Sequence, residues 1–218
     1  MTSKLVDILL ESDALRFGEF ETKAGRLSPY FINFGNVCGG NHFGTLCKMF
    51  ATKILNSDLS SQILYGPAYK GIPLAAGVSL VLSESSTDYR FAYNRKEAKK
   101  HGEGGNFVGA EFHSGDKVII VEDVLTGGTS IRESYEMLRK AGVEIEGIII
   151  ALDREERGKG QQSAKDELQE SLKVPVISIQ TMSDLLDDLK SLPSNKQPTT
   201  KQWELIQDYR AKWGSASQ

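Results

Sequence analysis

The stretch Val118 to Ser130, with the sequence V-I-I-V-E-D-V-L-T-G-G-T-S, decides which fold is expected for this chain. Its first half is an apolar run that ends in two adjacent carboxylates, Glu122 and Asp123. Such a run is typical of a buried strand that reaches a polar edge of a sheet. The small residues 126–129 that follow predict a loop.

The residues beyond this loop predict a helix and a second strand. Ser130 followed by Glu133 has the pattern of a capping box at the start of a helix. Gly142, directly after a basic last turn, predicts where that helix ends. Residues 145–152 are apolar enough for a second buried strand. The whole is a βαβ unit, whose loop lies where open α/β sheets bind their ligands.

The residue types in this loop indicate which ligand it binds. Small residues let backbone N–H groups approach an anion at the positive end of the helix. Glu122 and Asp123 would repel a phosphate, but they are well placed to accept hydrogen bonds from sugar hydroxyls. The stretch therefore predicts a site for a ribose 5-phosphate.

Other interpretations of the stretch fit less well. A Walker loop needs Gly-Lys-Ser/Thr, and a dinucleotide fingerprint needs its glycines before its acid. Here neither pattern is present, because the acids precede the glycines. A buried strand with an ordinary polar turn is the remaining alternative, but two adjacent acids followed by T-G-G-T are unusual for a plain turn.

Alternating strands and helices extend along the rest of the chain, which favours an α/β fold with a mainly parallel sheet flanked by helices. Short strands are expected at 19–21 and 30–33, around a turn at Gly25. Further strands are expected at 62–65, 90–93 and 174–179, and helices at 4–15, 42–56, 71–83, 163–172 and 182–189. With 218 residues, the chain is interpreted as a single domain, 1–218.

The C-terminal segment is expected to be a helix behind a linker. Residues 191–200 are the best linker candidate. Thr199 and Gln202 have the pattern of a capping box for a helix that runs through Lys212. Apolar residues recur at helical spacing along it, so a helix docked on its own domain is favoured over one that binds a partner.

Composition excludes several classes of protein. The net charge is −3, so no overall field favours nucleic acid or a membrane surface. No apolar stretch approaches the roughly 20 residues of a membrane span, and the N-terminus lacks a secretory pattern. Cys38 and Cys47 form neither a disulfide framework nor a metal motif. A cytoplasmic protein is expected.

Residues 94–106 combine basic side chains with glycines and have no apolar period. Alone, such a segment is best interpreted as a solvated loop. Beside a site for a ribose phosphate, it is better interpreted as a mobile lid whose cations contact the phosphates of a substrate.

These motifs together resemble the type I phosphoribosyltransferases, whose signature is four apolar residues, two acids, two apolar residues and Thr-Gly/Ala-Gly-Thr. Residues 17–31 and 94–105, with Tyr69-Lys70-Gly71 and Leu152-Asp153-Arg154, narrow the resemblance to the orotate phosphoribosyltransferase branch. The resemblance extends from about residue 3 to residue 160, and these segments in this order are highly specific.

The resemblance implies an enzyme, a glycosyltransferase of pyrimidine biosynthesis. It would transfer the phosphoribosyl group of 5-phospho-α-D-ribose 1-diphosphate to orotate, giving orotidine 5′-monophosphate and diphosphate. It also implies a small hood built largely from the N-terminal segment, and a homodimer with shared active sites. Mg²⁺ would be the cofactor, held mainly by substrate and water rather than by a protein metal site.

The resemblance also assigns roles to individual residues. Lys99 and Asp123 would be catalytic, Lys99 by assisting departure of the diphosphate. Orotate would contact Phe31, Ile32, Thr126 and Arg154, the last by gripping its carboxylate. The ribose diphosphate would contact Lys23, Tyr69, Lys70, Arg95, Lys96, Lys99, His101, Glu122, Asp123, Val124, Leu125, Thr126, Gly127, Gly128, Thr129 and Ser130.

Some residues depart from the pattern of the branch. Glu122 stands where Asp is more frequent, Ala24 where Ser is usual, and Ile32 where a second Phe is frequent. Two other functions stay open. A regulatory sensor for the ribose diphosphate would carry a nucleic-acid-binding face, and a purine transferase would not need Arg154 or the segment 23–31.

Overall fold

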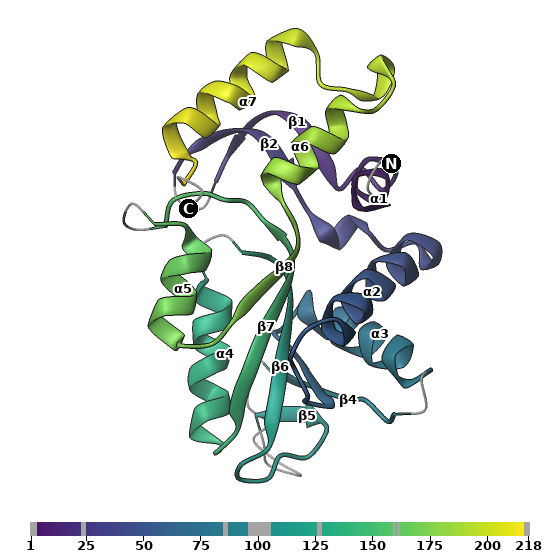
Figure 1. Cartoon of the computed structure of the whole chain (residues 1–218), viewed down its shortest axis with the longest axis vertical. Coiled ribbons are helices and arrows are strands. Elements are labelled where there is room, and N and C mark those ends of the chain that lie inside the picture. The colour runs from purple at the N-terminus through teal and green to yellow at the C-terminus, as the bar shows by residue number, and fades with distance from the viewer. Residues whose placement is uncertain are drawn as a thin grey trace.

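The structure, a computed structural model, describes residues 4–22, 25–84, 87–95, 106–125, 128–158, 160 and 162–215. At its centre is a sheet in the order β5-β4-β3-β6-β7-β8 (Figure 1). The pairs β3–β4, β3–β6, β6–β7 and β7–β8 are parallel, and β5 runs antiparallel to β4. The strands are β3 (Ile63–Gly66), β4 (Arg90–Asn94), β5 (Phe107–Gly109), β6 (Lys117–Leu125), β7 (Glu144–Asp153) and β8 (Val176–Thr181). The predicted α/β fold is confirmed.

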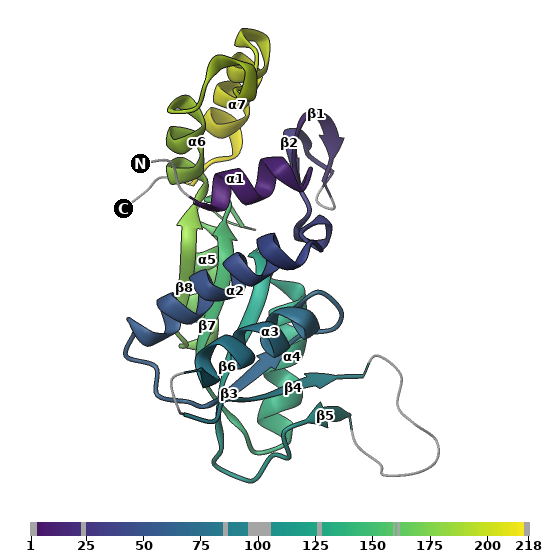
Figure 2. The same cartoon turned by 90° about the vertical axis from the view of Figure 1, so that its right-hand side faces the viewer.

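Helices cover both faces of this sheet (Figures 1 and 2). Ile119 and Val121 of β6 belong to the core on the side of α2 (Gly40–Leu55) and α3 (Gly71–Ser83). Val118 and Ile120 belong to the core beside α4 (Thr129–Lys140) and α5 (Ala164–Leu172). A parallel strand buried on both faces needs apolar residues at every position, and this explains the unbroken run that opens the decisive stretch.

A second layer lies beyond the carboxyl ends of the strands (Figure 1). We call it the hood: α1 (Lys4–Glu11), the antiparallel pair β1 (Leu15–Glu21) and β2 (Leu27–Ile32), α6 (Met182–Lys190) and α7 (Thr200–Trp213). Short 3₁₀ turns, η1 (Phe34–Asn36) and η2 (Ser194–Lys196), connect its parts. The N-terminal and C-terminal segments of the chain meet in the hood, where the rings of Tyr30 and Tyr209 pack edge to face with centroids 5.7 Å apart.

Most elements agree with the sequence expectation, but α1 and β1 have other bounds and the edge strand β5 was not predicted. Helix α3 spans the predicted residues, and α7 begins with the predicted capping box of Thr199 and Gln202. Helix α1 ends at Glu11 instead of continuing to Leu15, which belongs to β1 and pairs with Ile32. The prediction was wrong there because strand pairing, a tertiary contact, outweighed the helical spacing of the leucines.

Candidate active site

Two acids near the end of β6 form one side of the site. Glu122 and Asp123 are both less than a tenth exposed. The carboxylate of Asp123 accepts a hydrogen bond from the Val124 N–H at 2.8 Å and lies 2.9 Å from the Lys70 ammonium. Strand β6 continues past the acids to Leu125, which is in register with Asp153 of β7. The acids therefore stand inside the strand, which ends two residues later than the sequence predicted.

The carboxyl group of Glu122 resists ionisation. Burial, followed by the charge of Asp123, raises its pKa to about 8, while the Ser130 hydroxyl, which donates to Glu122 at 3.1 Å, opposes the shift. Burial in a low-dielectric environment disfavours the charged form of an acid. Glu122 therefore keeps its proton to a higher pH than an ordinary carboxyl, and in that form the pair can both donate and accept hydrogen bonds.

The beginning of α4 differs from the predicted capping box. The helix starts at Thr129, and its N-cap is Gly128, which has a left-handed conformation (φ 67°) and makes no side-chain capping bond. Ser130 lies in the first turn and bonds Glu122 instead of the backbone. Since Gly128 occupies the N-cap position, Ser130 is the second residue of the helix and its hydroxyl is free to donate to Glu122. Thr126 and Gly127 lie outside the described residues.

The loop between β3 and α3 brings a lysine to these acids. A side chain at Gly66 would lie 2.1 Å from the carbonyl oxygen of Gly71, so only glycine permits this tight approach. The Ala68 N–H donates to the Asn94 side chain at 2.9 Å, which ties the loop to the end of β4. Lys70 thereby reaches Asp123, while the neighbouring Tyr69 is 67% exposed.

The two ends of the predicted lid, residues 94–106, lie next to each other. The Arg95 N–H donates to the carbonyl of Asn106 at 2.8 Å, so the residues on either side of 96–105 are hydrogen-bonded to each other. The structure thus places Arg95 beside the end of β4. The remaining predicted diphosphate contacts, Lys23, Lys96, Lys99 and His101, lie outside the described residues.

Phe31 and Ile32 lie on opposite faces of β2. Phe31 is 41% exposed and stacks on Phe20 with ring centroids 5.4 Å apart. The side chain of Ile32 belongs to the hydrophobic core. A planar ligand can therefore contact the ring of Phe31, whereas Ile32 has only its main chain to offer.

Arg154 follows the last residue of β7 and is buried, with 6% exposure. Its Nε and Nη2 donate to Oε1 of Glu156 at 2.9 and 2.6 Å, and its Nη2 lies 3.5 Å from the Ser28 hydroxyl. The guanidinium also lies over the ring of Tyr30, 5.0 Å from its centroid. A buried arginine in a polar cluster differs from the solvated surface arginine that a charged run usually contains.

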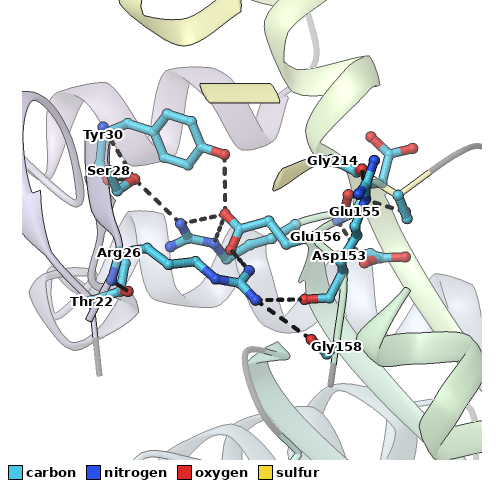
Figure 3. Close-up of polar contacts among 12 residues, drawn as sticks. Thr22, Arg26, Ser28, Tyr30, Asp153, Glu155, Glu156, Gly158 and Gly214 are labelled. Atoms are coloured by element: carbon cyan, nitrogen blue, oxygen red, sulfur yellow. Dashed lines mark hydrogen bonds and ion pairs between the residues drawn. The ribbon is translucent and has the colours of Figure 1, made fainter. Parts of the chain in front are cut away.

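Arg26, in the turn before β2, and Ser28 and Tyr30 of β2 complete this cluster around Glu156, as Figure 3 shows. The Tyr30 hydroxyl donates to Glu156 at 3.3 Å, and the Arg26 guanidinium lies 3.8 Å from the same carboxylate. Burial, followed by the charge of Glu156, raises the pKa of Tyr30 far above its usual range. No role was predicted for these residues, although Arg26, Ser28 and Tyr30 stand in the motif segment 17–31.

A metal cage is absent from the described part of the chain: no three His, Cys, Asp or Glu side chains there are grouped to hold an ion. Asp123 is already paired with Lys70, and Glu122 with Ser130. This donor set fits an ion that is carried by substrate oxygens and water better than one held by the protein. None of the described helices is long and apolar enough to cross a membrane.

Comparison with known proteins identifies the family. The phosphoribosyl transferase domain family matches residues 40–184. Orotate phosphoribosyltransferase of Marinobacter nauticus is 48% identical over 190 residues, which are 87% of this chain and 89% of the relative. That of Chromobacterium violaceum is 46% identical over 94% of this chain and 93% of its own.

A solved structure extends the likeness to three dimensions. The crystal structure of orotate phosphoribosyltransferase from Francisella tularensis matches with a TM-score of 0.82 and 34% identity, covering 98% of this chain and 100% of that one. The likeness thus includes the hood as well as the sheet. With the paired acids of β6, the parallel strands β6 and β7 joined through α4, and the buried arginine in place, the chain belongs to the orotate phosphoribosyltransferases, a group of enzymes within the phosphoribosyl transferase domain family.

Proposed function

We propose that this enzyme transfers the phosphoribosyl group of 5-phospho-α-D-ribose 1-diphosphate to orotate, giving orotidine 5′-monophosphate and diphosphate in pyrimidine biosynthesis. The observation that carries the proposal is the buried Arg154 at the end of β7, beside the acids of β6. Neighbouring parallel strands end at the same edge of the sheet, so a base held by Arg154 lies next to a ribose held by the acids.

The ribose diphosphate would occupy the edge formed by β3, β4 and β6. Asp123 and Glu122 would bond the ribose hydroxyls, and the backbone at the start of α4 would hold the 5-phosphate. Lys70 lies within reach of the same ligand, since it already contacts Asp123. Tyr69, Arg95 and residues 124–130 would complete this half of the site, with Lys23, Lys96 and His101 carried over from the family resemblance.

Orotate would lie between the hood and the sheet. Its carboxylate would pair with Arg154, its ring would pack on the exposed face of Phe31, and the main chain of Ile32 and Thr126 would bond its polar edge. Because the ring loses its proton readily enough to bind as an anion, no protein base is needed. The requirement for Arg154 distinguishes orotate from purine bases, which have no carboxylate.

The chemistry requires neutralisation of a leaving group. As the bond at C1 of the ribose breaks, the sugar gains oxocarbenium character and the diphosphate gains charge. Lys99 of the lid would supply a donor to the departing diphosphate, and closure of the lid would exclude water. Mg²⁺ bound to the diphosphate would neutralise part of its charge.

The proposal includes a cytoplasmic homodimer in which the loop 94–106 of one subunit closes over the site of its partner. Few residues of that loop are apolar, so it has little with which to fold onto its own domain. Leu55 of α2 and Leu80 of α3, which are 58% and 72% exposed, are side chains that a second subunit would cover in this dimer.

Diphosphate release tests the reaction. The purified enzyme is supplied with Mg²⁺, the ribose diphosphate and one base: orotate, uracil, adenine or hypoxanthine. We expect release with orotate in large excess over the other three. Use of adenine or hypoxanthine without use of orotate would contradict the proposal at the level of the substrate.

A further inference from the structure

The guanidinium of Arg154 has a defined orientation. Its Nε and Nη2 both donate to one oxygen of Glu156, at 2.9 and 2.6 Å. Within the ranges that the structure describes, Nη1 donates to no protein group. A guanidinium offers two edges to a carboxylate, and Glu156 occupies the Nε–Nη2 edge. The edge that contains Nη1 is left for a ligand.

Residues from the N-terminal and C-terminal segments of the chain contact Glu156. Its carboxylate accepts a hydrogen bond from the Tyr30 hydroxyl and lies near the Arg26 guanidinium. Its backbone forms a bridge with Gly214, directly after α7. On either side of it, the Arg157 N–H donates to the carbonyl of Trp213 at 2.9 Å, and the Ser215 N–H to that of Glu155 at 2.8 Å. The position of Glu156 therefore depends on contacts that converge from residues distant in sequence.

The charged side chains around Glu156 include more cations than anions, so one more anion would balance them. Two guanidinium groups, of Arg26 and Arg154, face the single carboxylate of Glu156. The neighbouring acids have cations of their own: Glu155 pairs with Arg210 at 3.0 Å, and Asp153 lies 3.9 Å from Lys165. An incoming carboxylate would balance the second guanidinium, which is the less costly arrangement for buried charges.

We infer that Glu156 is a positioning residue for substrate recognition: it holds Arg154 by the Nε–Nη2 edge and so directs the Nη1 edge at the carboxylate of the pyrimidine. The inference rests on the proposed function, in which Arg154 binds that carboxylate. It assigns a purpose to the C-terminal helix, because the end of α7 fixes the backbone of Glu156. Neither Glu156 nor α7 needs to touch the substrate.

A pair of nucleotides that differ only in the carboxylate isolates this effect. Orotidine 5′-monophosphate carries it and uridine 5′-monophosphate does not, so their dissociation constants are measured by calorimetry for the full-length protein. For Glu156→Gln we expect roughly tenfold weaker binding of the orotidine nucleotide. This is the change expected when one charge-assisted contact between Arg154 and the pyrimidine carboxylate is lost. Binding of the uridine nucleotide should not change. Glu155→Gln is the matched control, since Glu155 stands next in the chain but pairs with Arg210.

A double-mutant cycle tests whether Glu156 acts through Arg154. Once Arg154 is replaced by Ala, adding Glu156→Gln should not lower the preference for the orotidine nucleotide any further. Equal weakening of both nucleotides by Glu156→Gln, or an unchanged preference, would overturn the inference. If Glu156→Gln does not fold, Glu156→Asp, which withdraws the carboxylate by one methylene, is measured in the same way.

Different results would refute the proposed function and the positioning role of Glu156. If the unaltered enzyme neither uses orotate nor prefers the orotidine nucleotide, the proposed function fails, and the inference with it. If the unaltered enzyme shows both properties and Glu156→Gln keeps the preference, only the positioning role of Glu156 is refuted.

Discussion

Replacing Asp123 by Asn separates the binding of ribose from the stability of the fold. The Asn side chain keeps an acceptor for the Val124 N–H, which now donates to Asp123 at 2.8 Å. It loses the charge that faces Lys70 at 2.9 Å. Lys70 is about half exposed, and an ion pair of that kind contributes roughly 0–1 kcal/mol. The unfolding free energy should therefore change by less than about 1 kcal/mol.

The effect on the substrate should be much larger. A hydrogen bond between a carboxylate and a sugar hydroxyl contributes about 1.5–3 kcal/mol, so losing one of them costs roughly 1.5–3 kcal/mol. This corresponds to about a 10- to 150-fold loss of kcat/KM for the ribose diphosphate. The KM for orotate should change little, because Arg154 and Phe31 are untouched.

Steady-state kinetics with each substrate varied in turn, together with urea unfolding, measure both quantities. Glu146→Gln is the matched control: Glu146 is also a paired acid of the sheet, but it accepts from the Ser60 and Ser61 N–H groups at the opposite end of β7. That variant should lose about 1–2 kcal/mol of stability and keep its kinetics. Unchanged kinetics for Asp123→Asn, or a loss of activity explained by unfolding, would refute a role in ribose binding.

Three further predictions follow from the same site. Arg154→Ala should raise the KM for orotate far more than that for the ribose diphosphate, with Arg154→Lys rescuing only partly; equal effects on both would make Arg154 a scaffold residue. The raised pKa of Glu122, about 8 against an ordinary 4.5, means that the folded state keeps a proton which the unfolded chain releases near pH 4.5. Unfolding free energy should therefore fall as pH rises from about 5 to 8, by an amount on the order of 3 kcal/mol, and Glu122→Gln should flatten that profile; parallel profiles would contradict the assignment. Inactive Lys99→Ala and Asp123→Asn homodimers should regain activity after subunit exchange, because one site of the mixed dimer carries neither change; exchange shown by mass without any return of activity would refute the shared site.

Local patterns determined most of the elements of this protein. The strand β6 could be predicted from its apolar run because a parallel strand covered on both faces tolerates few polar residues. Helix α3 and the Thr199–Gln202 capping box of α7 rest on backbone and side-chain preferences within a few residues, so their prediction was confirmed. The acids of β6 were predicted to bind ribose because two adjacent carboxylates before a small-residue loop can be read locally, although the strand continues past them to Leu125.

Contacts between distant residues decided the rest. Leu15 lies in a strand rather than a helix because it pairs with Ile32, and the N-cap of α4 is Gly128 rather than Ser130, whose hydroxyl donates to the buried Glu122. No local pattern marks Glu156, and only the fold brings Tyr30 to it from 126 residues away. A sequence pattern records neighbours along the chain, whereas the energy of a buried charge depends on neighbours in space.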